Sequence, residues 1–143
     1  MATLSKRRAA LTRWLATFYT GVIIGVSFIA TPAKFLVDDL TVGQLLLVGR
    51  ATFGVFGWIE LTLAGALCFL GWSSGAVRWV IGLVLLIVVV QIFGLRPTMD
   101  DRVTEIINGA SSESSLLHYL YVAMELAKIG LLVLVSAAIR ARR

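Results

Sequence analysis

Four long apolar stretches constrain the fold of this chain more than any other feature. They cover residues 14–35, 51–70, 77–95 and 116–139. A helix needs about 20 mainly apolar residues to cross the hydrocarbon core of a bilayer. The stretches lack the alternation of polar and apolar residues that marks the strands of a membrane barrel. We therefore predict one all-α domain over residues 1–143, a bundle of four transmembrane helices.

The composition agrees with a membrane protein and excludes several other classes. Hydrophobic residues make up 59% of the chain, against about 45–50% in soluble domains. The single cysteine, Cys68, excludes an internal disulfide framework, a Cys-x-x-Cys redox pair and a thiolate zinc site. The net charge is +5, but the sequence has no basic patch interleaved with aromatic residues, the pattern typical of nucleic-acid binding. We expect membrane lipids as partners, and no nucleic acid, metal or cofactor.

The basic residues predict the orientation of the chain. Eight lysines and arginines lie in the two termini and beside the loop between the second and third stretches, and four lie near the other two loops. Basic residues concentrate on the cytoplasmic side of membrane proteins, so both termini should be cytoplasmic. The first stretch exceeds the apolar core of a signal peptide, about 7–15 residues, and we expect it to be retained.

Two short helices are expected in the loops on the outer side. Thr41 is a candidate N-cap for a helix within residues 38–49. A second helix, over residues 100–108, would lie on the outer surface between the third and fourth spans, capped near Thr98 and ended by Gly109. Residues 110–115 then form a flexible loop.

Ionisable side chains lie inside the apolar stretches. A charge at the centre of a membrane helix costs about 2.5–3.5 kcal/mol on insertion scales, so such a residue normally has a partner or a function. At about 1.5 Å per residue, Glu60 and Glu125 fall at the same depth, and Lys128 lies one turn deeper. We predict that these three form a coupled network. Two carboxyls face one ammonium, so either one carboxyl is protonated or Arg50 or His118 contributes.

The fourth stretch carries most of the candidate site. His118, Tyr121, Glu125 and Lys128 follow at steps of three, four and three residues, so they share one helical face. Gln91 falls in the outer half of the third span. The candidate ligand-binding or polar cluster is Arg50, Glu60, Gln91, His118, Tyr121, Glu125 and Lys128. The same residues could instead form a buried ion pair that only fixes the register of the helices, or an interface with a partner protein.

Small residues in two spans indicate close helix packing. Gly54 and Gly57 precede Glu60 in the second span, and Gly21 and Gly25 lie in the first. Glycines at such spacing let helix backbones approach in lipid. They do not form a phosphate-binding loop, because none lies between a strand and a helix.

Four segments of the chain, residues 25–35, 49–53, 96–102 and 118–128, have a recognisable pattern. They resemble a family of small bacterial four-helix integral membrane proteins of unknown function. The resemblance implies the four-span fold and the bacterial inner membrane, and it implies no activity. The chain is more distantly similar to eukaryotic-type four-span membrane proteins. It lacks the Glu-Arg-x-x-x-Asn segment of the four-helix membrane enzymes that handle glutathione.

Three functions fit these observations. The first is the binding or transport of a small polar or amphipathic ligand in a pocket on the outer side. The second is an accessory or assembly subunit of a larger membrane complex, or of a homo-oligomer. The third is a membrane enzyme for a lipid-soluble substrate, with Glu125 or His118 as acid or base.

Overall fold

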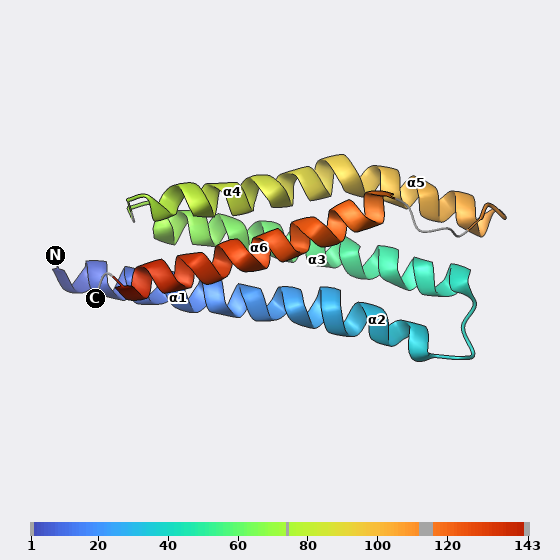
Figure 1. The fold of residues 1–143 in the computed structure, drawn as a ribbon, viewed down its shortest axis with the longest axis horizontal. Helices are drawn as coiled ribbons and strands as arrows, with labels where there is room; N and C mark the ends of the chain where they lie inside the picture. Colours follow the sequence, from blue (N-terminus) through green and yellow to red (C-terminus); the bar gives the residue numbers. More distant parts are fainter. Residues whose placement is uncertain (1, 74, 112–115, 142–143) are drawn as a thin grey trace.

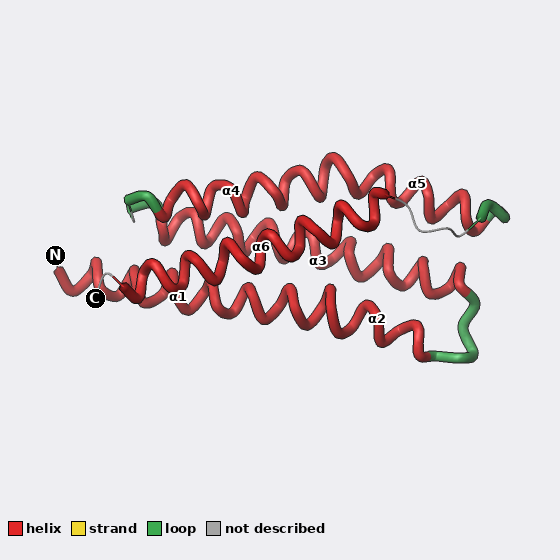
Figure 2. Tube along the Cα trace, in the orientation of Figure 1, coloured by secondary structure: helices red, strands yellow, loops and turns green. Residues whose placement is uncertain are grey.

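A computed structural model of the chain describes residues 2–73, 75–111 and 116–141. All regular secondary structure in these residues is helical, and it forms four long helices (Figures 1 and 2). Each is long and apolar enough to cross a membrane. The prediction of an all-α fold with four helices that can span a membrane is therefore confirmed.

The long helices are built from the following elements. The first contains α1 (Ala2–Ile23), the π-helical segment η1 (Ile24–Ala30), α2 (Thr31–Ala33) and the 3-10 turn η2 (Lys34–Leu36). The second is α3 (Val42–Gly71). The third contains α4 (Val77–Val90), the π-helical segment η3 (Gln91–Leu95) and α5 (Arg96–Ile107). The fourth is α6 (Leu116–Ala141).

The helices pack as a ring in the order α1, α3, α4, α6, so that α1 and α4, and α3 and α6, face each other diagonally. The start of α1, the end of α6 and the connection from α3 to α4 lie at one end of the bundle, which we call the terminal end (Figure 1). The connection from η2 to α3 and residues 108–111 lie at the other end, the loop end (Figure 2). The cytoplasmic side predicted for the termini would thus be the terminal end.

The expected helix within residues 38–49 is the first part of α3. The hydroxyl of Thr41 accepts a hydrogen bond from the backbone N–H of Gln44 at 3.3 Å. The side chain of Gln44 accepts one from the backbone N–H of Thr41 at 2.9 Å. Thr41 is therefore the N-cap, as predicted, and the helix runs on without a break into the membrane span.

The second expected loop helix, over residues 100–108, is likewise the end of a longer one. The third long helix continues from Val77 to Ile107, so α5 is its last part and not a separate helix. The predicted cap at Thr98 is wrong, because the chain is already helical at Leu95 and no side chain caps α5. Gly109, with φ of +102°, follows the end of the helix, as predicted.

Each of the two prolines lies two residues after the end of a π-helical segment. η1 ends at Ala30, ahead of Pro32, and η3 ends at Leu95, ahead of Pro97. Proline lacks the N–H that would bond to the carbonyl four residues earlier, and its ring clashes with that carbonyl. A wider π-helical turn relieves this conflict, and such turns are frequent at functional sites. Both helices continue through the proline, as α2 and as α5.

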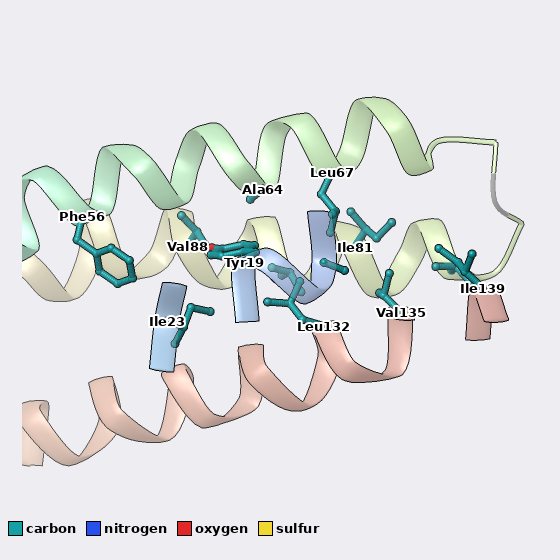
Figure 3. Packing of buried hydrophobic residues seen from close by; sticks show 13 residues of the cluster. Tyr19, Ile23, Phe56, Ala64, Leu67, Ile81, Val88, Leu132, Val135 and Ile139 are labelled. Atoms are coloured by element: carbon teal, nitrogen blue, oxygen red, sulfur yellow. The ribbon is translucent and has the colours of Figure 1, made fainter. Parts of the chain in front are cut away.

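A hydrophobic core fills the bundle from its middle to the terminal end (Figure 3). All four long helices contribute to it, through Ala16, Tyr19, Ile23, Phe56, Ala64, Leu67, Val77, Ile81, Val84, Val88, Leu132, Val135 and Ile139. Large side chains such as Trp58, Phe69 and Phe93 point outward and are more than 60% exposed. Outward apolar side chains suit a lipid surrounding, and the core leaves the loop end of the bundle free for polar groups.

The glycines of the second span admit neighbouring side chains. A Cβ atom at Gly57 would lie 3.2 Å from Cγ1 of Ile92, and one at Gly54 would lie 2.8 Å from Nη2 of Arg96. Gly21 and Gly25 do not pack in this way, since no described atom would lie within 4 Å of an added Cβ. The reason is that α1 turns the opposite face, with Ala16, Tyr19 and Ile23, into the bundle.

Candidate functional site

A buried ion-pair network crosses the middle of the bundle. The ammonium group of Lys128 on α6 donates hydrogen bonds to Oε1 of Glu60 on α3 and to Oε1 of Glu125, the latter at 3.0 Å. Each of the three side chains is at most 1% exposed. Because α3 and α6 face each other diagonally, the bond between Lys128 and Glu60 passes through the centre of the ring.

The other two long helices complete the network. The hydroxyl of Tyr19 on α1 donates to Oε1 of Glu60 at 3.0 Å. Nε2 of Gln91, at the start of η3, donates to Oε1 of Glu125 at 3.0 Å and to the backbone carbonyl of Tyr121 at 3.5 Å. Tyr19 is also part of the hydrophobic core, which Figure 3 shows around its ring. The network is therefore anchored on all four helices.

The network contains two carboxyl groups and one ammonium. Neither Arg50 nor His118 joins it by a hydrogen bond or ion pair in the described part of the chain. Arg50 lies nearer the loop end, and His118 is exposed with its ring 6.2 Å from that of Tyr119. Among the described residues, the network therefore contains one more acidic group than basic groups.

A cavity of about 440 Å³ lies between this network and the loop end. Its lining residues are Ser27, Phe28, Thr31, Pro32, Lys34, Phe35, Leu46, Gly49, Arg50, Phe53, Arg96, Met99, Asp100, Val103, His118, Tyr121, Val122 and Glu125. Four members of the predicted cluster, Arg50, His118, Tyr121 and Glu125, line this cavity. The remaining three, Glu60, Gln91 and Lys128, do not line it. Gln91 and Lys128 bond to the lining residue Glu125, and Gln91 also bonds to the backbone carbonyl of Tyr121.

Two arginines share one carboxylate in the cavity wall. Arg50 donates to the backbone carbonyl of Asp100 and, at 2.7 Å, to the hydroxyl of Thr104. Its Nε lies 3.4 Å from Oδ1 of Asp100. Arg96 donates to the backbone carbonyl of Gly54 at 3.3 Å, and its Nε lies 4.0 Å from Oδ2 of Asp100. Asp100 thus holds the two guanidinium groups beside each other.

A third basic residue in the wall has no such partner. Lys34 ion-pairs with no carboxylate among the described residues. Its ammonium lies 5.0 Å from the centre of the Phe35 ring and rests against Gly49 on α3, where a Cβ atom would collide with it. The side chain is partly buried, so its charge is neither fully hydrated nor balanced by a neighbouring acid.

Four buried polar atoms on residues that line the cavity have no hydrogen-bond partner among the described residues. They are Oε2 of Glu125, Oγ of Ser27, Nε of Arg50 and Nε of Arg96. A buried polar atom without a partner costs about 1–3 kcal/mol. Such atoms are explained when water or a ligand completes their hydrogen bonds. The Glu125 carboxyl therefore uses one oxygen for the network and leaves the other for the cavity.

Arg96, Asp100, Lys34, Ser27 and Tyr19 belong to this site and lie outside the predicted cluster. Arg96 and Asp100 are one helical turn apart, and their opposite charges could have indicated a shared face. Lys34 and Ser27 gave a weaker signal, since each is a polar residue near an apolar stretch. Tyr19 gave none, because an aromatic residue inside a span is as easily a core residue as a hydrogen-bond donor.

Comparison with protein-family models, with curated proteins and with solved structures gives no match for this chain. The described residues also contain no cluster of three or more His, Cys, Asp or Glu side chains that could hold a metal ion. The geometry of the cavity and of the network is therefore the basis for any functional conclusion.

Proposed function

We propose that this chain is a multi-pass protein of the bacterial inner membrane that binds or transports a small amphipathic ligand in the cavity. The observation that carries the proposal is the unpartnered Oε2 of Glu125, a residue that is 1% exposed and lines a largely apolar cavity. Ligand sites are typically apolar hollows of about 300–1,000 Å³ with a few well-placed polar groups. This cavity fits that description in volume and in lining.

A purely structural role for the network accounts for less of the geometry. An ion pair that only fixes helix register needs Lys128, Glu60 and the Oε1 atom of Glu125. It gives no reason for a second carboxyl oxygen to lie buried beside a cavity without a partner. Apolar cavities without polar groups stay empty, whereas a polar atom at the inner end favours a hydrated or ligand-bound state.

The cavity would open towards the outer side of the membrane. It is lined by residues near the loop end, such as Asp100 and Val103, and the basic termini predict that the terminal end is cytoplasmic. In a Cys68→Ala background, a membrane-impermeant thiol reagent applied to spheroplasts should label Ser111→Cys and not Ser73→Cys. Labelling of the second variant alone would reverse the orientation.

Native mass spectrometry tests the binding function directly. The purified protein is exposed to an equal mixture of dodecanesulfonate, dodecanol and dodecyltrimethylammonium, and we expect one retained molecule per protomer. Ser27→Phe, which fills the cavity, should remove it. Ala127→Phe adds a similar volume on an exposed face of α6 and should retain it. Equal retention by both variants, or no retention by the unmodified protein, would contradict the proposal.

A further inference from the structure

We infer that the ligand is a single-chain anionic amphiphile whose acidic group is bound by Lys34, Arg50 and Arg96. The inference rests on the proposed function, because it names the chemical class that the cavity accepts. It is drawn from the charges and the shape of the wall near the loop end.

The wall has more positive than negative charge. Lys34, Arg50 and Arg96 face only one free carboxylate, that of Asp100, which lies between the two guanidinium groups. The other acid of the lining, Glu125, is already bound to Lys128. Partly buried cations without counter-charges are costly near hydrocarbon, so an anion entering this wall restores the balance. A cationic ligand would increase the imbalance.

Two glycines of α3 make room for two of these cations. The ammonium of Lys34 occupies the space that a side chain at Gly49 would need. Nη2 of Arg96 would lie 2.8 Å from a Cβ atom at Gly54, and Nη1 donates to the carbonyl of the same residue. Arg50 follows directly after Gly49 in the sequence. Lys34 and Arg96 therefore each lie against a glycine of α3, on either side of Arg50 in the sequence.

The rest of the cavity suits an apolar chain. Phe28, Phe53, Met99 and Val122 are among its lining residues, and the ring of Phe53 packs edge-on against that of Tyr121 at 5.5 Å. A volume of about 440 Å³ lies in the lower part of the usual range for ligand sites, which favours one chain over the two chains of a phospholipid. The free oxygen of Glu125 would accept a hydrogen bond from water or from a hydroxyl on the ligand.

Equilibrium binding in nanodiscs of phosphatidylcholine tests the inference. The radiolabelled probes are dodecanesulfonate, dodecanol and dodecyltrimethylammonium, which share one chain and differ in charge. Dodecanesulfonate should bind at least about tenfold more tightly than dodecanol, as expected for hydrogen bonds to a charged group. Lys34→Gln should remove most of this preference, measured as the ratio of the two affinities. Lys6→Gln, an exposed lysine at the terminal end, is the matched control and should have no effect.

Gly49→Ala provides a second variant that keeps all the charges. Its added methyl group displaces the Lys34 ammonium, which is the mobile end of a flexible side chain, so the protein should still fold. The preference for dodecanesulfonate should fall without loss of dodecanol binding. Competition by phosphatidylglycerol added to the nanodiscs would overturn the single-chain part of the inference, because that lipid has two chains. If phosphatidylglycerol does not compete, a free single-chain amphiphile is supported.

The outcomes separate the two proposals. Equal affinities for dodecanesulfonate and dodecanol, unchanged in Lys34→Gln, would overturn the anionic class and leave the binding function standing. Tightest binding of dodecyltrimethylammonium would overturn it in the same way, and would point to Glu125 as the main ligand contact. Absence of saturable binding by all three probes would count against the proposed function itself.

Discussion

The two halves of this bundle use the same four helices differently. In the terminal half, Leu67, Ile81 and Leu132 are at most 1% exposed and pack in an aliphatic core (Figure 3). The loop half contains a cavity, two π-helical segments and several basic side chains. Helices in lipid associate by close packing and not by exclusion of water, so the terminal half is the natural source of stability. The loop half is less tightly packed because it contains the cavity.

The ion-pair network lies at the junction of the two halves. Tyr19 belongs to the hydrophobic core and donates to Glu60, whereas Glu125 lines the cavity. Lys128 joins the two carboxyls. A change at the inner end of the cavity can therefore be transmitted to the core through three hydrogen-bonded side chains. The comparison predicts that substitutions in the core and network affect stability, and that those in the cavity affect binding.

Lys128→Met should have the largest effect on stability. It leaves Glu60 and Glu125 buried without a cation, and removing one partner of a buried pair costs about 3–5 kcal/mol. Unfolding in mixed micelles with increasing dodecyl sulfate measures the loss. The double variant Lys128→Met with Glu125→Leu should be less destabilised than the single one, because it removes a buried charge as well. A milder single variant would show that the three groups are not coupled.

Leu67→Ala should follow, with a loss of about 2–4 kcal/mol in the same assay, since it opens a space in a fully packed core. Leu46→Ala is the matched change in the loop half, where the side chain already borders the cavity. We expect it to cost less than half as much. Similar losses of stability for both variants would mean that side chains fill the cavity in the purified protein. The two halves would then not differ in packing.

Much of this fold follows from the sequence because the relevant signals are local. Hydropathy and length predict four spans, and Thr41 and Gly109 predict helix ends from their own backbone chemistry. Counting residues along the helices also placed Glu60 and Glu125 at one depth, and Lys128 bonds to both. A constant rise per residue makes such counting reliable even when the packing is unknown.

The errors concern properties that depend on neighbouring helices. The fall in hydropathy after Leu95 suggested the end of a helix, yet helical hydrogen bonding continues through polar residues to Ile107. Gly21 was expected to pack, but small residues do not reveal which face of a helix meets its neighbours. Tyr19 and Arg96 join the site through contacts with α3, a neighbouring helix in the ring, and no spacing within one helix encodes such contacts.

Tyr19→Phe should cause a loss of about 1–2 kcal/mol, because it removes a hydrogen bond to an ionisable group and leaves the ring in the core. Dodecyl sulfate unfolding again measures the loss, and ligand binding in nanodiscs should be retained, since Tyr19 does not line the cavity. If Tyr19→Phe has the stability of the unmodified protein, the hydrogen bond from Lys128 is enough to stabilise the Glu60 carboxyl. The hydrogen bond from Tyr19 would then contribute little to the link between the core and the network.

Ser27→Ala should change stability the least of these variants. Unlike the substitutions in the core and the network, it should not lower stability. The Ser27 hydroxyl is buried without a partner among the described residues, so its removal takes away an unsatisfied group. Alanine also favours the helix slightly. Stability without ligand should therefore stay the same or rise by up to about 1 kcal/mol.

Thr31→Val is the control, because the Thr31 hydroxyl donates to the carbonyl of Val26 at 2.8 Å and its loss should destabilise the protein. If Ser27→Ala lowered stability as much as Tyr19→Phe, the Ser27 hydroxyl would have a hydrogen-bond partner in the folded protein. The buried polar groups of the loop half would then be as fully hydrogen-bonded as those of the terminal half.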